Sequence, residues 1–456
     1  MCWNIAARYS GCGGALWASE NNDPVNIHSI YPQINYYTFK NIKMKKINFL
    51  KHTLVIALIL TLGSCKKNDD KTLLQANQPP LLTEEMMSEK GANPDEASIA
   101  ENIGMTGNVV SRSEEDKGNE HYLYTESNSS GKNSILVYEV KGNGSLKLNG
   151  SATSGGAGTG KPLGSQGALV LDKNHKWLFA VNAGSNTVSS FKVGNDGSLT
   201  LAHTAASMGT KPVSVTVDGN ILYVLNNGSD NIHGFKIGST GTLSHIDGST
   251  KSLSGTAVDA PQISFTPDGD WLVVTEKSTN IVSTFKVKND GSVSSGTFTP
   301  SVGNTPFGFD FARGRFMIVS NAVGGGAGAG SATSYITGFN GIPKDVNGAI
   351  PNFQSAPCWV ATSKHGRFAY ITNTATNNVS SYYVAPWGGL YLIKSEAAKT
   401  DMSPLDIVVA ANNYFVYELN SKSNTIGGYR RTFFGGLEYI NKVSSLPTAT
   451  TGLATY

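Results

Sequence analysis

Six polar residues stand at equivalent positions, each at the end of a short apolar run and just before a turn. The six are Asn182, Asn226, Glu276, Asn321, Asn373 and Asn420, and a seventh position falls on Glu126 or Ser127. If these runs are strands of repeated units, the side chains gather on one face as an amide ring interrupted by Glu276. A carboxylate in such surroundings can act as a general base or bind a cation. The pattern therefore predicts a small-molecule site with Glu276 as its catalytic candidate.

Two lysines extend this predicted site. Lys161 and Lys211 each precede a proline that opens a strand, which places them on the same face. With the five asparagines they are the candidate ligand-binding residues. A structural role is the alternative for each asparagine, because Asn side chains often close such turns by bonding to their own backbone. For Glu276 the alternative is a solvated charge beside Lys277.

Other catalytic patterns are weak or missing from the sequence. Gly155–Lys161 fits a G-x-x-x-x-G-K phosphate loop, but Pro162 and another strand follow where Ser or Thr and a helix are needed. We therefore expect a flexible loop there. A second glycine-rich run, Val323–Ser331, is either a mobile lid or a tolerated insertion. There is no H-E-x-x-H, G-x-S-x-G or cysteine pair with metal spacing. The histidines fall in outer strands or distant turns, so histidine base catalysis is not expected.

The strands that carry the candidate residues repeat along the chain. Between Lys211 and Leu243, four apolar runs alternate with Gly- and Asn-rich turns, which is typical of a four-stranded antiparallel sheet. A turn residue followed five positions later by an aromatic recurs seven times. The pairs are Asn133/Tyr138, Asn186/Phe191, Asp230/Phe235, Asn280/Phe285, Ser334/Phe339, Asn377/Tyr382 and Asn424/Tyr429. Seven four-stranded units at this spacing predict an all-β fold, a seven-bladed β-propeller.

The tail of the chain supplies a strand that the first unit lacks. Prolines precede six first strands, at Pro162, Pro212, Pro261, Pro306, Pro357 and Pro404. The segment Gly452–Tyr456 lies where the next first strand is due. We predict that it joins the unit beginning near His121 and closes the ring, which leaves no unpaired inner strand.

The N-terminal region carries an export pattern. Met44–Lys46 is basic, and Leu54–Leu62 is apolar but too short to span a bilayer. Leu62-Gly63-Ser64-Cys65 follows and resembles the lipobox of bacterial lipoproteins. This order predicts lipidation at Cys65, with a buried or free thiol as the alternative.

Four regions follow from these patterns. They are residues 1–43, which we expect not to be translated or not to be mature; 44–65, signal peptide and lipobox; 66–104, a polar flexible tether; and 105–456, the propeller. The predicted location is the bacterial cell envelope, as an outer-membrane lipoprotein facing the periplasm or the cell surface.

Charge and cysteine content restrict the partners. The chain carries +3, but residues 65–456 hold 30 basic and 31 acidic residues, so nothing indicates a nucleic-acid partner. We expect a monomer that binds a small molecule and contacts the membrane through its lipid anchor. Cys358 is expected to be buried in a first strand.

Several segments give the chain a family likeness. HYLYTESN, LGSQGALVLD, LFAVNAGSN, KPVSVTV, LVVTEKSTN, TPFGFDF and TGLATY resemble the seven-bladed lactonase-like propellers, which include 6-phosphogluconolactonases and carboxymuconate-lactonizing enzymes. The resemblance covers residues 105 to 456. It implies His, Arg and Glu around a central funnel. Glu276 fits the carboxylate, Lys161 or Lys211 is the candidate replacement for Arg, and no histidine matches.

Two functions follow from different classes of protein. In the first, the protein hydrolyses a small lactone or sugar-acid lactone, and Glu276 activates water directly or through a divalent cation. In the second, it is a non-catalytic propeller that binds a sugar acid, a peptide or a partner protein on the same face.

Overall fold

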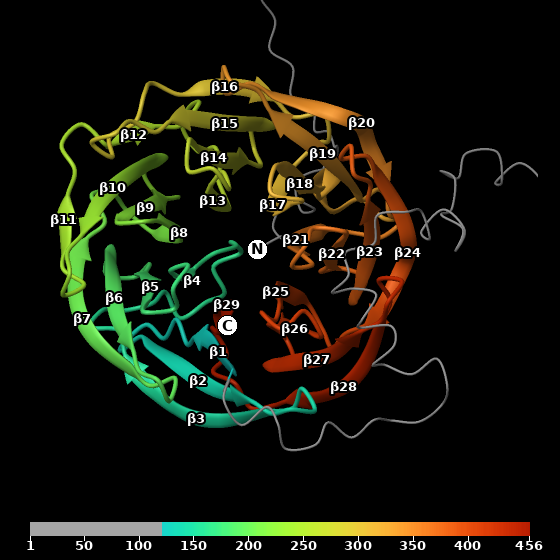
Figure 1. The fold of residues 1–456 in the computed structure, drawn as a ribbon, viewed down its shortest axis with the longest axis horizontal. Coiled ribbons are helices and arrows are strands. Elements are labelled where there is room, and N and C mark those ends of the chain that lie inside the picture. The colour runs from blue at the N-terminus through green and yellow to red at the C-terminus, as the bar shows by residue number, and fades with distance from the viewer. Residues whose placement is uncertain (1–120) are drawn as a thin grey trace, which may run out of the picture. The chain divides into compact units, whose positions relative to one another are not determined.

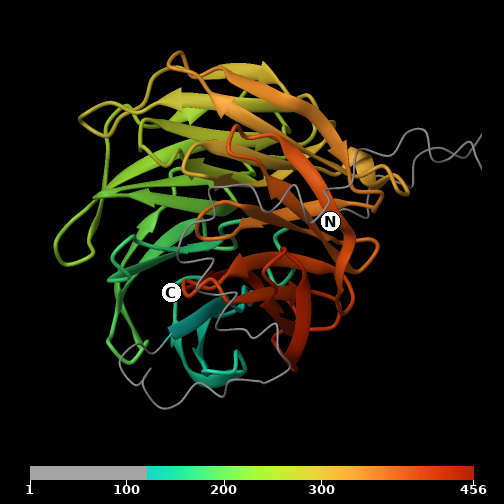
Figure 2. The ribbon, with the colours of Figure 1, turned by 45° about the vertical axis from the view of Figure 1, so that its right-hand side comes forward.

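The computed structural model describes residues 121–456, which form one ring of β-sheets (Figure 1; Figure 2). The predicted signal peptide, the lipidation site Cys65, the tether and residues 105–120 lie outside the described residues. Within 121–456 the strands form seven antiparallel sheets arranged as blades. None of the helices described there is long and apolar enough to cross a membrane.

Each blade runs from an inner first strand at the centre to an outer fourth strand. The first strands are β29 (Thr451–Thr455), β4 (Leu169–Leu171), β8 (Pro212–Asp218), β13 (Gln262–Phe265), β17 (Pro306–Ala312), β21 (Pro357–Thr362) and β25 (Pro404–Val409). The second strands are β1 (His121–Glu126), β5 (Trp177–Asn182), β9 (Ile221–Asn226), β14 (Trp271–Glu276), β18 (Phe316–Asn321), β22 (Phe368–Asn373) and β26 (Phe415–Asn420). We number the blades 1 to 7 in this order.

The outer half of each blade consists of the third and fourth strands. The third strands are β2 (Ser134–Val140), β6 (Thr187–Val193), β10 (Asn231–Ile237), β15 (Ile281–Lys286), β19 (Ser331–Thr337), β23 (Asn378–Val384) and β27 (Thr425–Arg431). The fourth are β3 (Leu146–Thr153), β7 (Leu199–Ala206), β11 (Leu243–His245) with β12 (Lys251–Ser252), β16 (Thr297–Pro300), β20 (Pro343–Pro351), β24 (Leu390–Lys399) and β28 (Leu437–Val443). The single-turn helix η1 (Val323–Gly325) lies in the glycine-rich loop of blade 5.

A buried aromatic residue at the fifth position of each third strand packs the blades together. The seven are Tyr138, Phe191, Phe235, Phe285, Tyr335, Tyr382 and Tyr429. The predicted pair Ser334/Phe339 is therefore wrong, because Phe339 lies in the turn after β19 and is 107% exposed. The long glycine-rich loop obscured where β19 begins, and the position that fits the repeat belongs to Tyr335.

The predicted closure of the ring is confirmed. β29 pairs antiparallel with β1, so the blade that contains the start of the described chain is completed by its end. The Thr125 hydroxyl donates to the Gly452 carbonyl at 2.7 Å, and the Asp406 carboxyl of blade 7 accepts from the Leu453 N–H at 3.0 Å. Cys358 is buried in the first strand β21, as predicted.

The alternating strand directions give the ring two unlike rims. On the loop rim lie the connections from second to third strands and from each blade to the next. On the turn rim lie the tight turns from first to second and from third to fourth strands. β1 is a second strand, so its first residue, His121, lies on the turn rim.

The segment before β4 crosses the centre of the ring (Figure 1). The Gln166 side-chain amide donates to the Val360 carbonyl at 2.6 Å and accepts from the Val360 N–H at 3.1 Å. The Trp359 indole donates to the Ser165 carbonyl at 2.7 Å, and the Gln166 N–H donates to the Pro261 carbonyl at 3.1 Å. We call Ser165 and Gln166 the axial plug. Through these bonds the plug joins blades 2, 4 and 6, which are not neighbours.

Replacing Gln166 with Ala is expected to destabilise the ring by about 1–3 kcal/mol, because the buried N–H and carbonyl of Val360 lose their partners. The free energy of unfolding, measured by denaturant titration, tests this. The surface substitution Lys173→Ala serves as the control, since its ion pair with Asp218 is exposed. Equal losses in both variants would contradict a role for the plug.

Candidate functional site

The predicted polar ring ends the second strands, but its members are buried. Each of Asn182, Asn226, Glu276, Asn321, Asn373 and Asn420 is the last residue of its strand and is no more than 1% exposed. Glu126 occupies the same position in blade 1 and is also fully buried. The structure therefore places these side chains between blades and away from solvent.

Glu276 is held by four hydrogen-bond donors. Its carboxylate accepts from the Ser254 N–H at 3.1 Å and from the Ser254 hydroxyl, and also from the hydroxyls of Thr279 at 2.8 Å and Ser283 at 2.5 Å. Ser254 belongs to the loop that leads into blade 4, and the other two residues belong to blade 4 itself. In this geometry Glu276 fastens the loop to the blade.

Four of the five asparagines bond to third-strand side chains, whereas the Asn226 amide donates to the Ser207 carbonyl of the loop before β8 at 2.9 Å. The Asn182 amide donates to the hydroxyls of Thr187 at 3.1 Å and Ser189 at 2.8 Å. In blade 6, Asn373 repeats this pattern with Asn378 and Ser380 at 2.7 and 2.8 Å. The amide thus joins two strands of one blade, which is neither the funnel position nor the self-capping turn weighed as its alternative.

Glu276→Gln is expected to lower stability by about 1–3 kcal/mol and to leave turnover unchanged, because the amide offers two donors to a site built of donors. Thermal unfolding and initial rates on the folded protein measure the two effects separately. A fall in the rate without a fall in stability would indicate that Glu276 takes part in catalysis.

One residue further along, each second strand has ended and the turn into the third strand begins. The neighbours of the buried ring are therefore turn residues on the loop rim. Asn227 follows Asn226, and Lys277 follows Glu276. These two side chains meet Asp259, a loop residue just before β13.

Five residues form what we term the mouth cluster: Lys211, Asn227, Asp259, Lys277 and Phe307. The Lys277 ammonium lies 3.0 Å from the Asp259 carboxylate and 4.6 Å from the centroid of the Phe307 ring. The Asn227 amide donates to Asp259 at 3.2 Å and accepts from the Lys211 ammonium at 3.3 Å. One carboxylate therefore lies among two cations and an amide.

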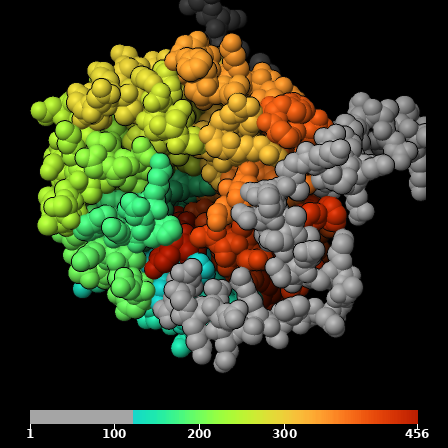
Figure 3. Space-filling view, in the orientation of Figure 1, coloured from blue at the N-terminus to red at the C-terminus, as the bar shows by residue number. Residues whose placement is uncertain are grey.

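Three neighbouring blades position this cluster on the loop rim. Lys211 precedes β8, Asn227 follows β9, Lys277 follows β14, and Phe307 lies in the first strand β17. Phe307 packs on Trp359 with ring centroids 5.0 Å apart, and the Trp359 indole holds the axial plug. The aromatic pair thus connects the cluster to the centre of the ring, which is hollowed on the face drawn in Figure 3.

Two residues of the loop that carries Asp259 have positive φ angles. Ala257 and Asp259 have φ angles of 55° and 54°, in the left-handed region that side chains disfavour. The Asp230 carboxylate holds the loop by accepting from the N–H groups of Ala257 at 2.7 Å and Val258 at 3.2 Å. Lys211, Thr305, Ala356 and Ser403, each directly before a first strand, also have positive φ angles, so this conformation recurs around the ring and belongs to the fold.

The charges keep Asp259 ionised. Burial alone would raise the pKa of its carboxyl, but the Lys277 ammonium, the hydrogen bonds from Lys277 and Asn227, and the charge of Lys211 together hold the pKa below its ordinary value. The Asp259 side chain is 50% exposed, whereas that of Lys277 is only 16% exposed. The carboxylate is therefore both charged and open to water.

Of the predicted site residues, only Lys211 joins the mouth cluster. Lys161 is exposed on the loop before β4, where its carbonyl accepts from the Asn128 amide at 2.6 Å. Sequence reasoning missed Asn227, Asp259 and Lys277. Asn227 and Lys277 directly follow the predicted residues Asn226 and Glu276, and this position was the signal that could have found them.

The described residues do not favour binding of a divalent cation at Glu276. Within 121–456 no three His, Cys, Asp or Glu residues are grouped as metal ligands. All the donors around Glu276 already point at its oxygens, so a cation there would have to displace hydrogen bonds. The site does not fit a metal at Glu276.

Comparisons with known proteins agree with the ring. A family model described as lactonase, 7-bladed beta-propeller, matches residues 115–260 and 249–325. A search of curated proteins finds no match. In fold and over the matched residues, the chain is therefore similar to the lactonase-like seven-bladed β-propellers.

Two solved structures show how far the likeness extends. A protein described as a putative 6-phosphogluconolactonase from Bacteroides fragilis is 18% identical, covers 75% of this chain and 99% of its own, and superimposes with a TM-score of 0.62. A periplasmic gluconolactonase from Pseudomonas aeruginosa is 19% identical, with 74% and 99% covered and a TM-score of 0.59. At these identities the likeness concerns the fold.

Proposed function

We propose that the protein hydrolyses the lactone of a sugar acid at the mouth cluster. The observation that carries this proposal is the half-exposed Asp259 carboxylate held between Asn227 and Lys277, whose ammonium lies over the Phe307 ring. The family match to lactonases and the structural neighbours described as lactonases support the same reaction class.

Each member of the cluster has a role in the proposed reaction. Asp259 accepts a proton from a water molecule as the water oxygen attacks the lactone carbonyl carbon. The Lys277 ammonium stabilises the negative charge that develops on the carbonyl oxygen. The ring C–O bond then breaks, its oxygen takes the proton back, and the product is the open hydroxy acid. Lys211 and Asn227 hold the polar groups of the sugar.

A specific observation favours a non-catalytic alternative. A carboxylate whose pKa lies below its ordinary range is a weak base at neutral pH. The same cluster, with two cations and one anion, would then bind a sugar acid, a peptide or a partner protein without turning it over.

A lactone panel separates these two functions. The purified protein is assayed with five- and six-membered sugar-acid lactones, with and without a phosphate group and with and without chelator. Turnover that survives chelation supports hydrolysis by the mouth cluster. Binding of the open sugar acid without turnover of any lactone supports the alternative.

We also propose that the protein reaches the cell envelope as a lipoprotein anchored at Cys65. The support is the order of basic, apolar and lipobox segments in residues 44–65. Mass spectrometry of the protein from membranes is expected to find an acylated N-terminal Cys65, and Cys65→Ser is expected to abolish the acylation. An unmodified, internal Cys65 would contradict the proposal.

A further inference from the structure

The turns between third and fourth strands differ in chemistry between the two halves of the ring. In blades 5, 6 and 7 they carry Phe339, Trp387, and the pair Phe433 and Phe434. Phe339 is 107% exposed and Trp387 is 52% exposed. In blades 1 to 4 the same turns (141–145, 194–198, 238–242 and 288–292) contain no aromatic residue. Large apolar side chains thus gather on one half of the turn rim.

Turn geometry does not require these aromatics. All seven turns contain a glycine with positive φ in the corresponding position: Gly144, Gly197, Gly241, Gly291, Gly341, Gly388 and Gly435. The seven turns therefore share one backbone conformation, and in four blades turns without an aromatic residue adopt it. What differs is only the side chain shown to the outside.

Positive charge follows the aromatics around the rim. The turns of blades 5 to 7 (313–315, 338–342, 363–367, 385–389, 410–414 and 432–436) contain Arg313, Arg315, Lys364 and Arg367 but no Asp or Glu. The corresponding turns of blades 1 to 4 contain five aspartates, namely Asp172, Asp196, Asp268, Asp270 and Asp290, which offset the four lysines Lys141, Lys173, Lys176 and Lys288. Residues 65–456 are nearly neutral as a whole, but the half of the turn rim formed by blades 5 to 7 is therefore basic.

Arginine and aromatic residues of neighbouring blades contact one another on this half. The Arg367 guanidinium lies 5.7 Å from the Phe433 ring centroid and 5.9 Å from that of Tyr383. The Arg313 guanidinium donates to the Val384 carbonyl at 2.8 Å. We call this surface the aromatic–basic arc, made of Phe339, Trp387, Phe433, Phe434, Arg313, Arg315 and Lys364, whereas Arg367 is buried beneath it.

We propose that the aromatic–basic arc rests on a membrane surface that contains anionic lipids. Aromatic rings settle at the level of lipid headgroups, and each nearby Lys or Arg adds electrostatic attraction to an anionic leaflet. A contiguous exposed apolar patch with a charged border marks such interaction surfaces. The described chain also begins on this rim, at His121.

This contact would orient the ring. With the turn rim on the lipid, the loop rim and its mouth cluster face away from the membrane and remain open to dissolved ligands. The contact is separate from the proposed acylation of Cys65 and from the proposed lactone hydrolysis.

Vesicle flotation of the full chain carrying Cys65→Ser tests the arc without a lipid anchor. The wild-type arc is expected to bind vesicles of phosphatidylethanolamine and phosphatidylglycerol, and more weakly those of phosphatidylcholine alone or in high salt. The double variant Phe339→Ser/Trp387→Ser and the variant Arg315→Glu are each expected to bind about tenfold or more weakly. Because every variant keeps the same N-terminal region, the differences report on the arc.

Matched variants on other surfaces are the controls. Leu148→Ser/Phe298→Ser removes exposed apolar side chains from the outer strands, and Lys288→Glu reverses a charge on a turn of blade 4. Both are expected to bind like the wild type. Equal binding by arc and control variants would overturn the proposal, as would binding to nucleic acid or an acidic polysaccharide with none to vesicles.

Discussion

Replacing Asp259 with Asn is expected to reduce kcat/KM for lactone hydrolysis by about 10²–10⁴-fold, the usual contribution of a positioned general base. Asn keeps the shape of the side chain and an oxygen that can accept from Asn227 or Lys277. The ring should therefore stay folded while the proton acceptor is lost. Initial rates over a range of lactone concentrations measure the effect, and thermal unfolding confirms the fold.

The ring contains a matched control for this substitution. Lys286 pairs with Asp270 at 2.6 Å and lies 5.1 Å from the Trp271 ring centroid, which repeats the Lys277–Asp259–Phe307 arrangement on the turn rim. Asp270→Asn removes a charge of the same kind and should leave the rate unchanged. If both variants lose activity equally, or neither does, Asp259 is not the base.

The dependence of the hydrolysis rate on pH tests Asp259 in a second way. Because the pKa of Asp259 lies below its ordinary value near 3.8, the carboxylate stays charged through mildly acidic conditions. The rate should therefore not fall with the titration of this group until the pH drops below that value. An acid limb near pH 6 would point to a different base.

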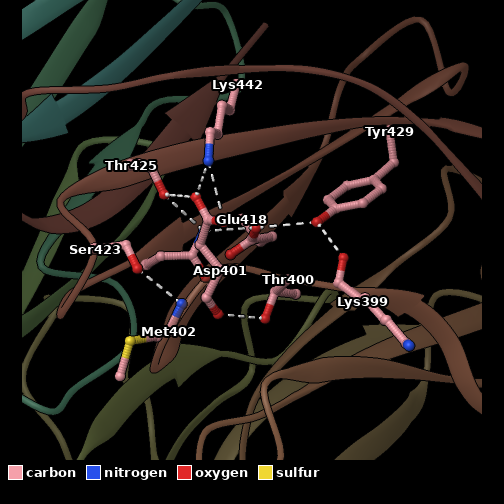
Figure 4. Close-up of polar contacts among 10 residues, drawn as sticks. Lys399, Thr400, Asp401, Met402, Glu418, Ser423, Thr425, Tyr429 and Lys442 are labelled. Atoms are coloured by element: carbon pink, nitrogen blue, oxygen red, sulfur yellow. Dashed lines mark hydrogen bonds and ion pairs between the residues drawn. The ribbon is translucent and has the colours of Figure 1, made fainter.

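Stability of the folded ring is expected to fall as pH rises from about 4.5 to about 8, and Glu418 contributes to this fall together with Glu126, whose pKa burial raises well above its ordinary value. Glu418 is a residue of β26 and is fully buried in blade 7 (Figure 4). Its carboxyl accepts from the Asn420 amide at 2.8 Å and from the Tyr429 hydroxyl at 3.1 Å. Its other oxygen, Oε2, has no hydrogen-bond partner among the described residues.

Burial determines how Glu418 titrates. Loss of water raises its pKa to about 8, the hydrogen bonds from Asn420 and Tyr429 oppose this, and the nearby Asp401 charge adds to it. In the unfolded chain the group titrates near 4.5. Between these values the folded state binds the extra proton, so stability decreases by about 1.4 kcal/mol or less for each pH unit.

Glu418→Gln removes the Glu418 contribution because the amide is neutral at every pH, whereas Glu126 contributes equally in both proteins. The variant is expected to match the wild type near pH 5 and to exceed it in stability at pH 8. Asp406, whose pKa burial raises to about 7, adds a similar slope that flattens above that value. The comparison between pH 7 and 8 is therefore the most specific to Glu418.

Denaturant titrations at several pH values measure the slope. Glu438→Gln is the control, since Glu438 is exposed and pairs with Arg430 at 2.7 Å. Identical slopes in the wild type and in Glu418→Gln would show that Glu418 is charged in the folded ring.

Much of the fold follows from local sequence. Apolar residues at alternate positions specify strands, and glycine and asparagine specify the turns between them. The repeat of this pattern gives the seven blades, and the position of Gly452–Tyr456 gives the closure by β29. The error at Ser334/Phe339 arose where a glycine-rich loop without alternation separated two strands, so that local pattern alone could not locate β19.

The site needed the tertiary structure. The sequence identified the ends of the second strands, but whether Glu276 or Lys277 joins the mouth cluster depends on the twist of a blade and on its neighbours, which no local pattern records. Asn227, Asp259 and Phe307 come from three blades, and their contacts exist only once those blades pack side by side.

The repeat thus determined the ring and its blade number, because each unit rests on residues near one another in sequence, and the place of Gly452–Tyr456 in the repeat determined which strand closes the ring. The three-dimensional packing decided which polar groups are sealed between blades and which remain open to water. It also joined Gln166 to Val360 through the centre of the ring, a pairing of residues 194 positions apart. Hydrogen bonds and ion pairs at such separations depend on the position of every intervening blade, so they appear only in the folded molecule.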